Sequence, residues 1–249
     1  MDLSLLLSGG FLSGLYAQPH SFFNFSFLPK YLLYFSQGVL YTLLLSIVSV
    51  ALAVLPALGL ALMRLSKNKV VKGISGAYIA VFRSTPLLVQ LSIVSYGLFA
   101  GFNPRITVFG FLMLDTFIPC CVALALNSSA YVAEIFRAGI LAVDAGQMEA
   151  ARSLGLSKWQ GMKMVVLPQA IKNVLPALAN EIVTMVKESS ICMTLGIMDL
   201  MFAAKTTAGS TWISLGPYTL AAIIYFAINF PASKIIEAIE RRMRRGDIR

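Results

Sequence analysis

Charged residues are scarce in this sequence of 249 residues. Asp, Glu, Lys and Arg make up 12% of it, whereas 58% of the residues are hydrophobic and the mean hydropathy is +0.79. A soluble domain carries about 25% charged residues, so a water-soluble globular protein is excluded. A disordered chain, which needs low hydrophobicity, is excluded as well. The composition indicates a protein embedded in a membrane.

Cysteine and histidine are equally sparse. Of the three cysteines, Cys120 and Cys121 are adjacent and Cys192 lies in an apolar run, so they form no spaced disulfide framework. We expect them to be small buried hydrophobic residues. The single histidine, His20, has no second member for a proton relay or a metal site. We therefore expect no catalytic residues and no metal site in this chain.

Five stretches are long and apolar enough to cross a bilayer as helices, which takes about 20 residues each. They are residues 31–63, 73–104, 106–133, 173–198 and 206–233. Arg83 lies inside the second stretch, and Glu181, Lys187 and Glu188 lie inside the fourth. The sequence therefore predicts an all-α integral membrane protein with five transmembrane helices.

The basic residues indicate the orientation, because cytoplasmic loops are enriched in Lys and Arg. Fifteen of the 20 basic residues lie in three alternate connections, 64–72, 134–172 and 234–249. The N-terminus is thus expected outside and the C-terminus in the cytoplasm. A basic run can also bind nucleic acid, but beside a span it is more simply an anchor at the lipid surface, so no nucleic acid partner is expected.

The expected organisation has three parts. They are an extracytoplasmic N-terminal tail (1–30), a transmembrane domain (31–245) that includes a cytoplasmic loop (141–168), and a cytoplasmic tail (246–249). Within the first span Gly38, Thr42 and Ser46 recur every four residues. This spacing of small residues predicts a close contact with another helix.

The loop 141–168 is too polar to span a membrane and too patterned to be a linker. Two N-terminal capping pairs occur in it, Asp144 with Gln147 and Ser157 with Gln160. Gly155 suits the left-handed position that ends a helix, and Pro168 is expected to end the second helix. The pattern predicts two short helices with a glycine turn between them.

The surface of this loop is suited to docking. Ala150 and Ala151 are expected to leave the backbone accessible around the acidic Glu149, and Trp159 and Val166 fall on one apolar face. Such a shape fits the groove of another protein. An interfacial helix without a partner would show the same pattern, and the residues alone leave both readings open.

One motif in the loop resembles a known signature. Glu149-Ala150-Ala151, then Gly155 and Leu167-Pro168, resemble the EAA motif of the membrane subunits of ABC importers, which reads E-A-A, three residues, G, nine residues, I, one residue, L-P. Val165 stands at the isoleucine position, a mild departure. Three further segments, 83–90, 127–140 and 187–190, resemble the branch of this family that handles polar amino acids: histidine, glutamine, arginine, glutamate or cystine.

The resemblance covers roughly residues 30 to 245 and implies a type I importer permease of the bacterial inner membrane. Such a permease pairs with an identical or a sister permease, and an extracytoplasmic binding protein delivers the amino acid. The resemblance assigns coupling to a separate ATPase to Glu149, Ala150, Ala151 and Gly155. The chain contains no G-x-x-x-x-G-K-[ST] loop for phosphate, so no cofactor is expected in it, and ATP and Mg²⁺ are expected on the partner ATPase.

The charges inside the spans are candidates for the substrate path, because an ionisable residue at bilayer depth is costly. Glu181 and Glu188 lie seven residues apart on one helical stripe, and with Lys187 they suit the two charges of a zwitterionic solute. Arg83, three residues before Pro86, suits a carboxylate. The structural alternatives are ion pairs among these residues, or between Arg83 and Glu134.

An ion-coupled secondary transporter of small zwitterionic solutes is the alternative function, since it also uses carboxylates inside the membrane. An integral-membrane enzyme is disfavoured, because the sequence offers no histidine cluster, metal-ligand spacing or nucleophile triad.

Overall fold

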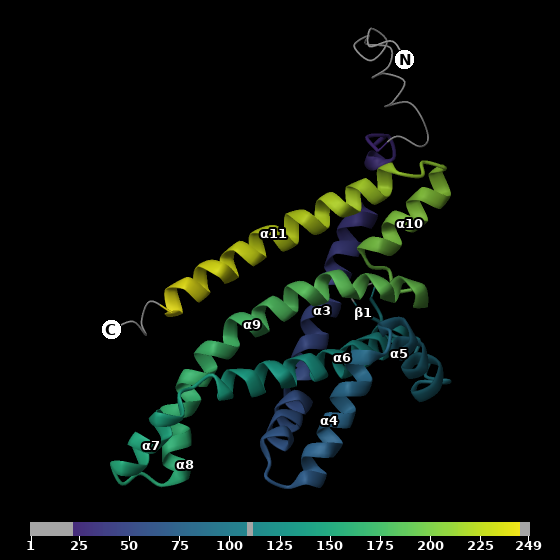
Figure 1. The fold of residues 1–249 in the computed structure, drawn as a ribbon. Helices are drawn as coiled ribbons and strands as arrows, with labels where there is room; N and C mark the ends of the chain where they lie inside the picture. The colour runs from purple at the N-terminus through teal and green to yellow at the C-terminus, as the bar shows by residue number, and fades with distance from the viewer. Residues whose placement is uncertain (1–21, 109–111, 245–249) are drawn as a thin grey trace, which may run out of the picture.

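The computed structural model describes residues 22–108 and 112–244, and they form a helical fold with one short hairpin (Figure 1). The long helices are α3 (Leu28–Leu65), α6 (Leu114–Leu141), α9 (Leu167–Glu188) and α11 (Gly216–Arg244). The shorter ones are α4 (Lys69–Ser84), α5 (Leu87–Ile93), η1 (Val94–Leu98), α7 (Ala145–Ser153), α8 (Lys158–Gly161), η2 (Met162–Val166), η3 (Ser189–Leu195) and α10 (Leu200–Thr211). The antiparallel strands β1 (Thr107–Val108) and β2 (Leu112–Met113) form the hairpin. Helix α3 begins three residues inside the tail that was expected over 1–30.

The prediction of five spans is confirmed, with three continuous helices and two broken ones in the described part of the chain. Helices α3, α6 and α11 are each long and apolar enough to cross a membrane. The second span consists of α4 and the α5–η1 segment, bent by 110°, and the fourth consists of the helix over 158–195 and α10, bent by 49°. A broken helix leaves backbone groups that side chains must satisfy in lipid.

Helix α6 lies at the centre of the fold. It contacts α3, α4, α5 and α9, and 72% of its most apolar window is buried, against 33% for α3 and 6% for α11. In Figure 1, α6 crosses α3, α9 lies alongside it, and α11 lies on the far side of α9. The outer helix α11 thus presents most of its surface away from the rest of the chain.

The main apolar cluster joins α6 to α3, α5, α9 and η3. All three cysteines lie in it as free thiols, buried as predicted.

The small-residue face of α3 is a close helix contact, as the spacing predicted. A Cβ atom at Gly38 would lie 3.0 Å from the carbonyl oxygen of Asp199. Thr42 is fully buried, and its Oγ1 accepts a hydrogen bond of 3.1 Å from the backbone N–H of Leu200. Asp199 caps α10 by accepting a hydrogen bond of 2.8 Å from Phe202 N–H. This contact therefore fixes where α10 starts against α3.

Replacing Gly38 by leucine is expected to destabilise the fold, because the side chain meets backbone that cannot move aside. Overpacking of this kind costs about 1–3 kcal/mol. The matched control is Gly59→Leu in the same helix, where a Cβ meets nothing within 4 Å. Thermal unfolding in detergent should give a lower midpoint for Gly38→Leu than for Gly59→Leu. Equal midpoints would contradict the close contact at Gly38.

Candidate functional site

Two regions carry the candidate functional residues, the loop over α7 and α8 and the break in the second span. In Figure 1, α7 and α8 lie together beyond the joined ends of α6 and α9, away from α10. The break between α4 and α5 lies against α6, which α4 and α5 both contact.

The predicted helix starts and the glycine turn in the loop are confirmed. Asp144 caps α7 by accepting a hydrogen bond of 2.7 Å from Gly146 N–H, but Gln147 does not complete the expected capping pair, because its Oε1 accepts a hydrogen bond of 3.2 Å from Gln169. Ser157 and Gln160 form the reciprocal capping box at the start of α8, with distances of 3.2 and 2.7 Å. Gly155 has φ +84, which is the left-handed conformation that a glycine adopts readily. The loop is therefore a defined structure of its own.

The expectation that Pro168 ends the second helix is wrong. Helix α8 continues through the π-helical turn η2 into α9, so one helix runs from Lys158 to Leu195. In η2 the N–H of Leu167 donates to the carbonyl of Met162, five residues back. This wide turn shifts the hydrogen-bond register just before Pro168, and a proline is tolerated in the first turn that follows.

The accessibility predicted for the two alanines holds for only one of them. Ala150 and Glu149 are exposed, but Ala151 is 3% exposed and faces α8. A Cβ atom at Gly161 would lie 3.4 Å from the Ala151 Cβ and 2.9 Å from the Met148 Sδ. Ala151 is buried because α7 folds back on α8, a contact that local sequence does not reveal. The Ala151 side chain therefore packs between α7 and α8 and does not lie on the outer surface of the loop.

Leu154 and Trp159 are the most exposed of the large apolar side chains of the loop. Leu154, beside the glycine turn, is 84% exposed, and Trp159 is 73% exposed, whereas Val166 of the same predicted face is buried. The sequence pattern did not single out Leu154. Together with Glu149 and Ala150 they are the exposed residues of the loop that suit docking, and we refer to these four as its docking surface: Glu149, Ala150, Leu154 and Trp159.

The break in the second span follows from Pro86. Proline has no backbone N–H, so the carbonyl of Phe82, four residues earlier, loses its helical donor. Gln90 supplies a replacement, since its Nε2 donates to the Phe82 oxygen at 2.8 Å and to the Thr85 carbonyl and Oγ1 at 3.0 and 2.8 Å. Asn127 of α6 adds a second donor to Phe82 at 3.3 Å and another to the Gln90 Oε1 at 2.8 Å. Side-chain amides therefore satisfy the broken backbone.

Arg83 stacks on an aromatic ring and forms no ion pair with Glu134. Its guanidinium carbon lies 5.2 Å from the centre of the Tyr131 ring on α6. Glu134 instead pairs with Arg64 at 3.4 Å and Arg137 at 2.8 Å. Arg83 faces a hollow of about 500 Å³ that it shares with Arg64, Tyr131 and Glu134. Of the two alternatives for Arg83, the pair with Glu134 is thus absent.

The charged residues of the fourth span are held differently from one another. The Oε1 of Glu181 accepts a hydrogen bond of 2.8 Å from Ser128 of α6, while Lys187 is exposed and Glu188 is half-buried. Among the described residues, none of the three forms an ion pair with another or with Arg83. The alternative of a structural ion pair is therefore not observed in this chain.

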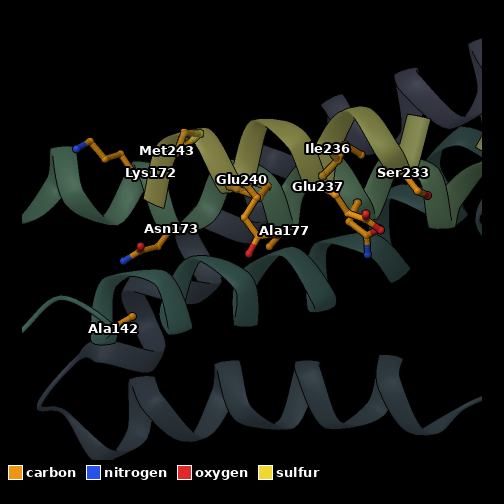
Figure 2. Close-up of a pocket in the computed structure, with 11 residues that line it drawn as sticks. Ala142, Lys172, Asn173, Ala177, Ser233, Ile236, Glu237, Glu240 and Met243 are labelled. Atoms are coloured by element: carbon orange, nitrogen blue, oxygen red, sulfur yellow. The ribbon is translucent and has the colours of Figure 1, made fainter. Parts of the chain in front are cut away.

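A groove between α9 and α11 was not predicted (Figure 2). It has a volume of about 460 Å³ and is lined by Ala142, Lys172, Asn173, Pro176, Ala177, Asn180, Ser233, Ile236, Glu237, Glu240 and Met243. Ser233, Glu237 and Glu240 recur at helical spacing, so they share one face of α11. This spacing was a readable signal, but their partner α9 is about 60 residues away in sequence.

A bulky residue at Ala151 is expected to separate α7 from α8, because no space remains between them. The test compares Ala151→Leu with Ala150→Leu, which lies on the exposed face of the same helix. Limited trypsin cleavage at Arg152 and Lys158 should accelerate several-fold in Ala151→Leu only. Equal cleavage rates in both variants would show that Ala151 does not hold the two helices together.

Comparisons with known proteins agree with this arrangement. Residues 49–245 match the family described as binding-protein-dependent transport system inner membrane component. A putative glutamine transport system permease protein of Rickettsia typhi is 40% identical over 87% of this chain and 95% of the relative. An arginine transport system permease protein of Bacillus subtilis is 39% identical over 85% of this chain and 93% of its own length.

Solved structures show the same fold. A chain from the crystal structure of an amino acid ABC transporter is 44% identical, with a TM-score of 0.78, over 88% of this chain and 98% of that one. A chain of a methionine ABC transporter, at 20% identity and a TM-score of 0.59 over 84% and 97%, shares the fold.

Proposed function

Since this chain belongs to the family of binding-protein-dependent transport system inner membrane components, we propose that it forms the translocation path for ATP-driven import of a polar amino acid. The similar proteins named above are permeases for glutamine and arginine and an amino acid ABC transporter. The ion-coupled alternative is not favoured, because the family itself is one of binding-protein-dependent transport systems.

The docking surface of the loop is the observation that carries this proposal. It combines one exposed carboxylate, Glu149, with the apolar side chains of Leu154 and Trp159 on a capped two-helix frame. A surface of this kind suits insertion into a groove of another protein. We assign that groove to a separate ATPase, which binds the ATP and Mg²⁺ that drive transport.

The residues proposed for coupling act in different ways. Glu149 and Ala150 contact the ATPase directly, Ala151 holds α7 on α8, and Gly155 makes the turn between the helices. The loop and the C-terminus then lie in the cytoplasm of a bacterium and the N-terminus outside, as the basic residues indicate. A second permease, identical or a sister, and an extracytoplasmic binding protein complete the transporter.

The proposed substrate path includes the charged residues of the broken spans. Arg83 has no carboxylate partner in the described chain, so its guanidinium is available to the carboxylate of an amino acid. Glu181 accepts one hydrogen bond from Ser128 and keeps lone pairs for an ammonium group. Lys187 and Glu188 are placed on the same path.

Uptake in proteoliposomes tests the function as a whole. The chain is reconstituted with a candidate partner ATPase and a candidate binding protein, and uptake of labelled arginine and glutamine is measured. We expect uptake to need ATP on the ATPase side and to persist when ion gradients are collapsed. Uptake that continues without ATP under an ion gradient would favour the secondary transporter.

Substitution of Gly155 tests the coupling role of the loop. A phenylalanine at φ +84 costs about 1–2 kcal/mol of backbone strain, which distorts the turn without a steric clash, because a Cβ there meets nothing within 4 Å. We expect ATP-dependent uptake to fall at least tenfold while membrane insertion stays unchanged. The control is Gly73→Phe in α4, which also has open space but an ordinary helical backbone. Uptake at the original rate in Gly155→Phe would refute coupling through this turn.

A further inference from the structure

The N–H donors of the Gln90 and Asn127 side-chain amides are all engaged by other groups of the protein at the break. Both side chains are buried. The two N–H groups of Gln90 serve the Phe82 and Thr85 oxygens, and its Oε1 accepts from Asn127. Both N–H groups of Asn127 are used as well, on Gln90 and Phe82. A polar pair at this depth is a default candidate for binding solute, but these donors are already occupied.

Apolar packing on the inside of the bend is incomplete. The inside of the bend holds a hollow of about 260 Å³, lined mainly by Val81, Phe82, Val89 and Ile93. A filled corner would resist bending and straightening through side-chain contact, and the hollow lowers that resistance on the inside of the bend. Apolar contacts pack each half on α6, through Ile79 of α4 and Leu91 of α5. The amides are the hydrogen-bonding groups that link the two halves to each other across Pro86.

The same helix also holds the side chain of Arg83. Asn127 and Tyr131 are four residues apart, so they lie one above the other on one face of α6. Asn127 donates to the carbonyl of Phe82, and the ring of Tyr131 lies under the guanidinium of the next residue, Arg83. Helix α6 thus contacts the last turn of α4 through two side chains that lie one helical turn apart on α6.

We propose that Gln90 and Asn127 form an amide clamp that sets the angle of the break and positions Arg83 for the transported amino acid. Its first part, the angle, rests on the hydrogen bonds alone. Its second part rests on the proposed function, because it needs Arg83 on the substrate path. Both clamp residues are positioning residues, which act through the backbone of Phe82 and not on the solute.

The angle is measured as a distance between spin labels on cysteines introduced at Lys72 in α4 and Leu98 in η1, both exposed. The native cysteines are buried and stay in place. In the assembled transporter we expect one narrow distance for the native clamp. Gln90→Met keeps the side-chain length but removes both donors, and the distribution should become at least twice as wide. Asn127→Ser is the second variant, and Gln37→Met, in α3 away from the break, is the control.

A further substitution distinguishes a loss of order at the break from a change in the angle of the break. Pro86→Ala returns a backbone N–H that can donate to the Phe82 carbonyl. Added to Gln90→Met, it should restore a narrow distribution at a longer distance, because a continuous helix replaces the bend. A width unchanged from the native protein in both Gln90→Met and Asn127→Ser would overturn the clamp, whatever the transport activity.

The positioning of Arg83 is read from transport kinetics with labelled arginine and glutamine. If the clamp places Arg83, Gln90→Met should raise the KM for uptake about tenfold, as expected for loss of a buried hydrogen bond, with ATP still required. Gln37→Met should leave the KM unchanged. A widened distance distribution with an unchanged KM would overturn the positioning part and leave the clamp as a support of the bend alone. The distance measurement does not depend on transport, so failure of the proposed function is distinguishable from failure of the clamp.

Discussion

The requirement that backbone hydrogen bonds be satisfied without water governs this structure. Inside a bilayer no water is present to donate a hydrogen bond to an unpaired carbonyl. Two of the five spans are nevertheless broken. The fold meets the requirement with side chains from α5, α6 and α3, beginning with Gln90 of α5, which donates to the Phe82 carbonyl at 2.8 Å. Asn127 reaches the carbonyl left free by Pro86, and Thr42 accepts from the backbone N–H of Leu200 at the start of α10. The central position of α6 follows from this role, and so does the burial of its polar residues.

The polar residues of the spans divide by what they contact. Ser129 and Tyr78 join α6 to α4 through a hydrogen bond of 2.9 Å between their hydroxyls, and the amides support the break. Glu134 is held between two arginines. Arg83 is left with an aromatic ring in place of an acid, an arrangement that keeps its charge available. Within the described residues, Arg83 thus differs from Glu134 in having no oppositely charged side chain beside it.

Local signals in the sequence predicted local structure well. The capping residues Asp144 and Ser157 and the turn at Gly155 act within a few residues of themselves, so their outcome is readable from the sequence. The burial of Ala151 depends on Gly161 across the turn, and the bond between Gln90 and Asn127 joins residues 37 apart. The prediction that Pro168 ends a helix was wrong because the π turn before it changes the hydrogen-bond register. No residue type in the sequence indicates such a turn. The sequence singled out Arg83 as an unusual charge inside a span. It could not show that Arg64 and Arg137 pair with Glu134 and leave Arg83 beside Tyr131.

The continuous helix that begins at Lys158 has a mechanical consequence. Since Pro168 does not interrupt it, α8, η2 and α9 form one continuous rod up to the break before α10. Glu181 lies about 35 Å along that rod from its start, at 1.5 Å per residue. A tilt of 5° at the loop end would move Glu181 by about 3 Å, the length of a hydrogen bond. A small rotation of the loop, carried along this continuous helix, would therefore be enough to make or break the contact between Glu181 and Ser128.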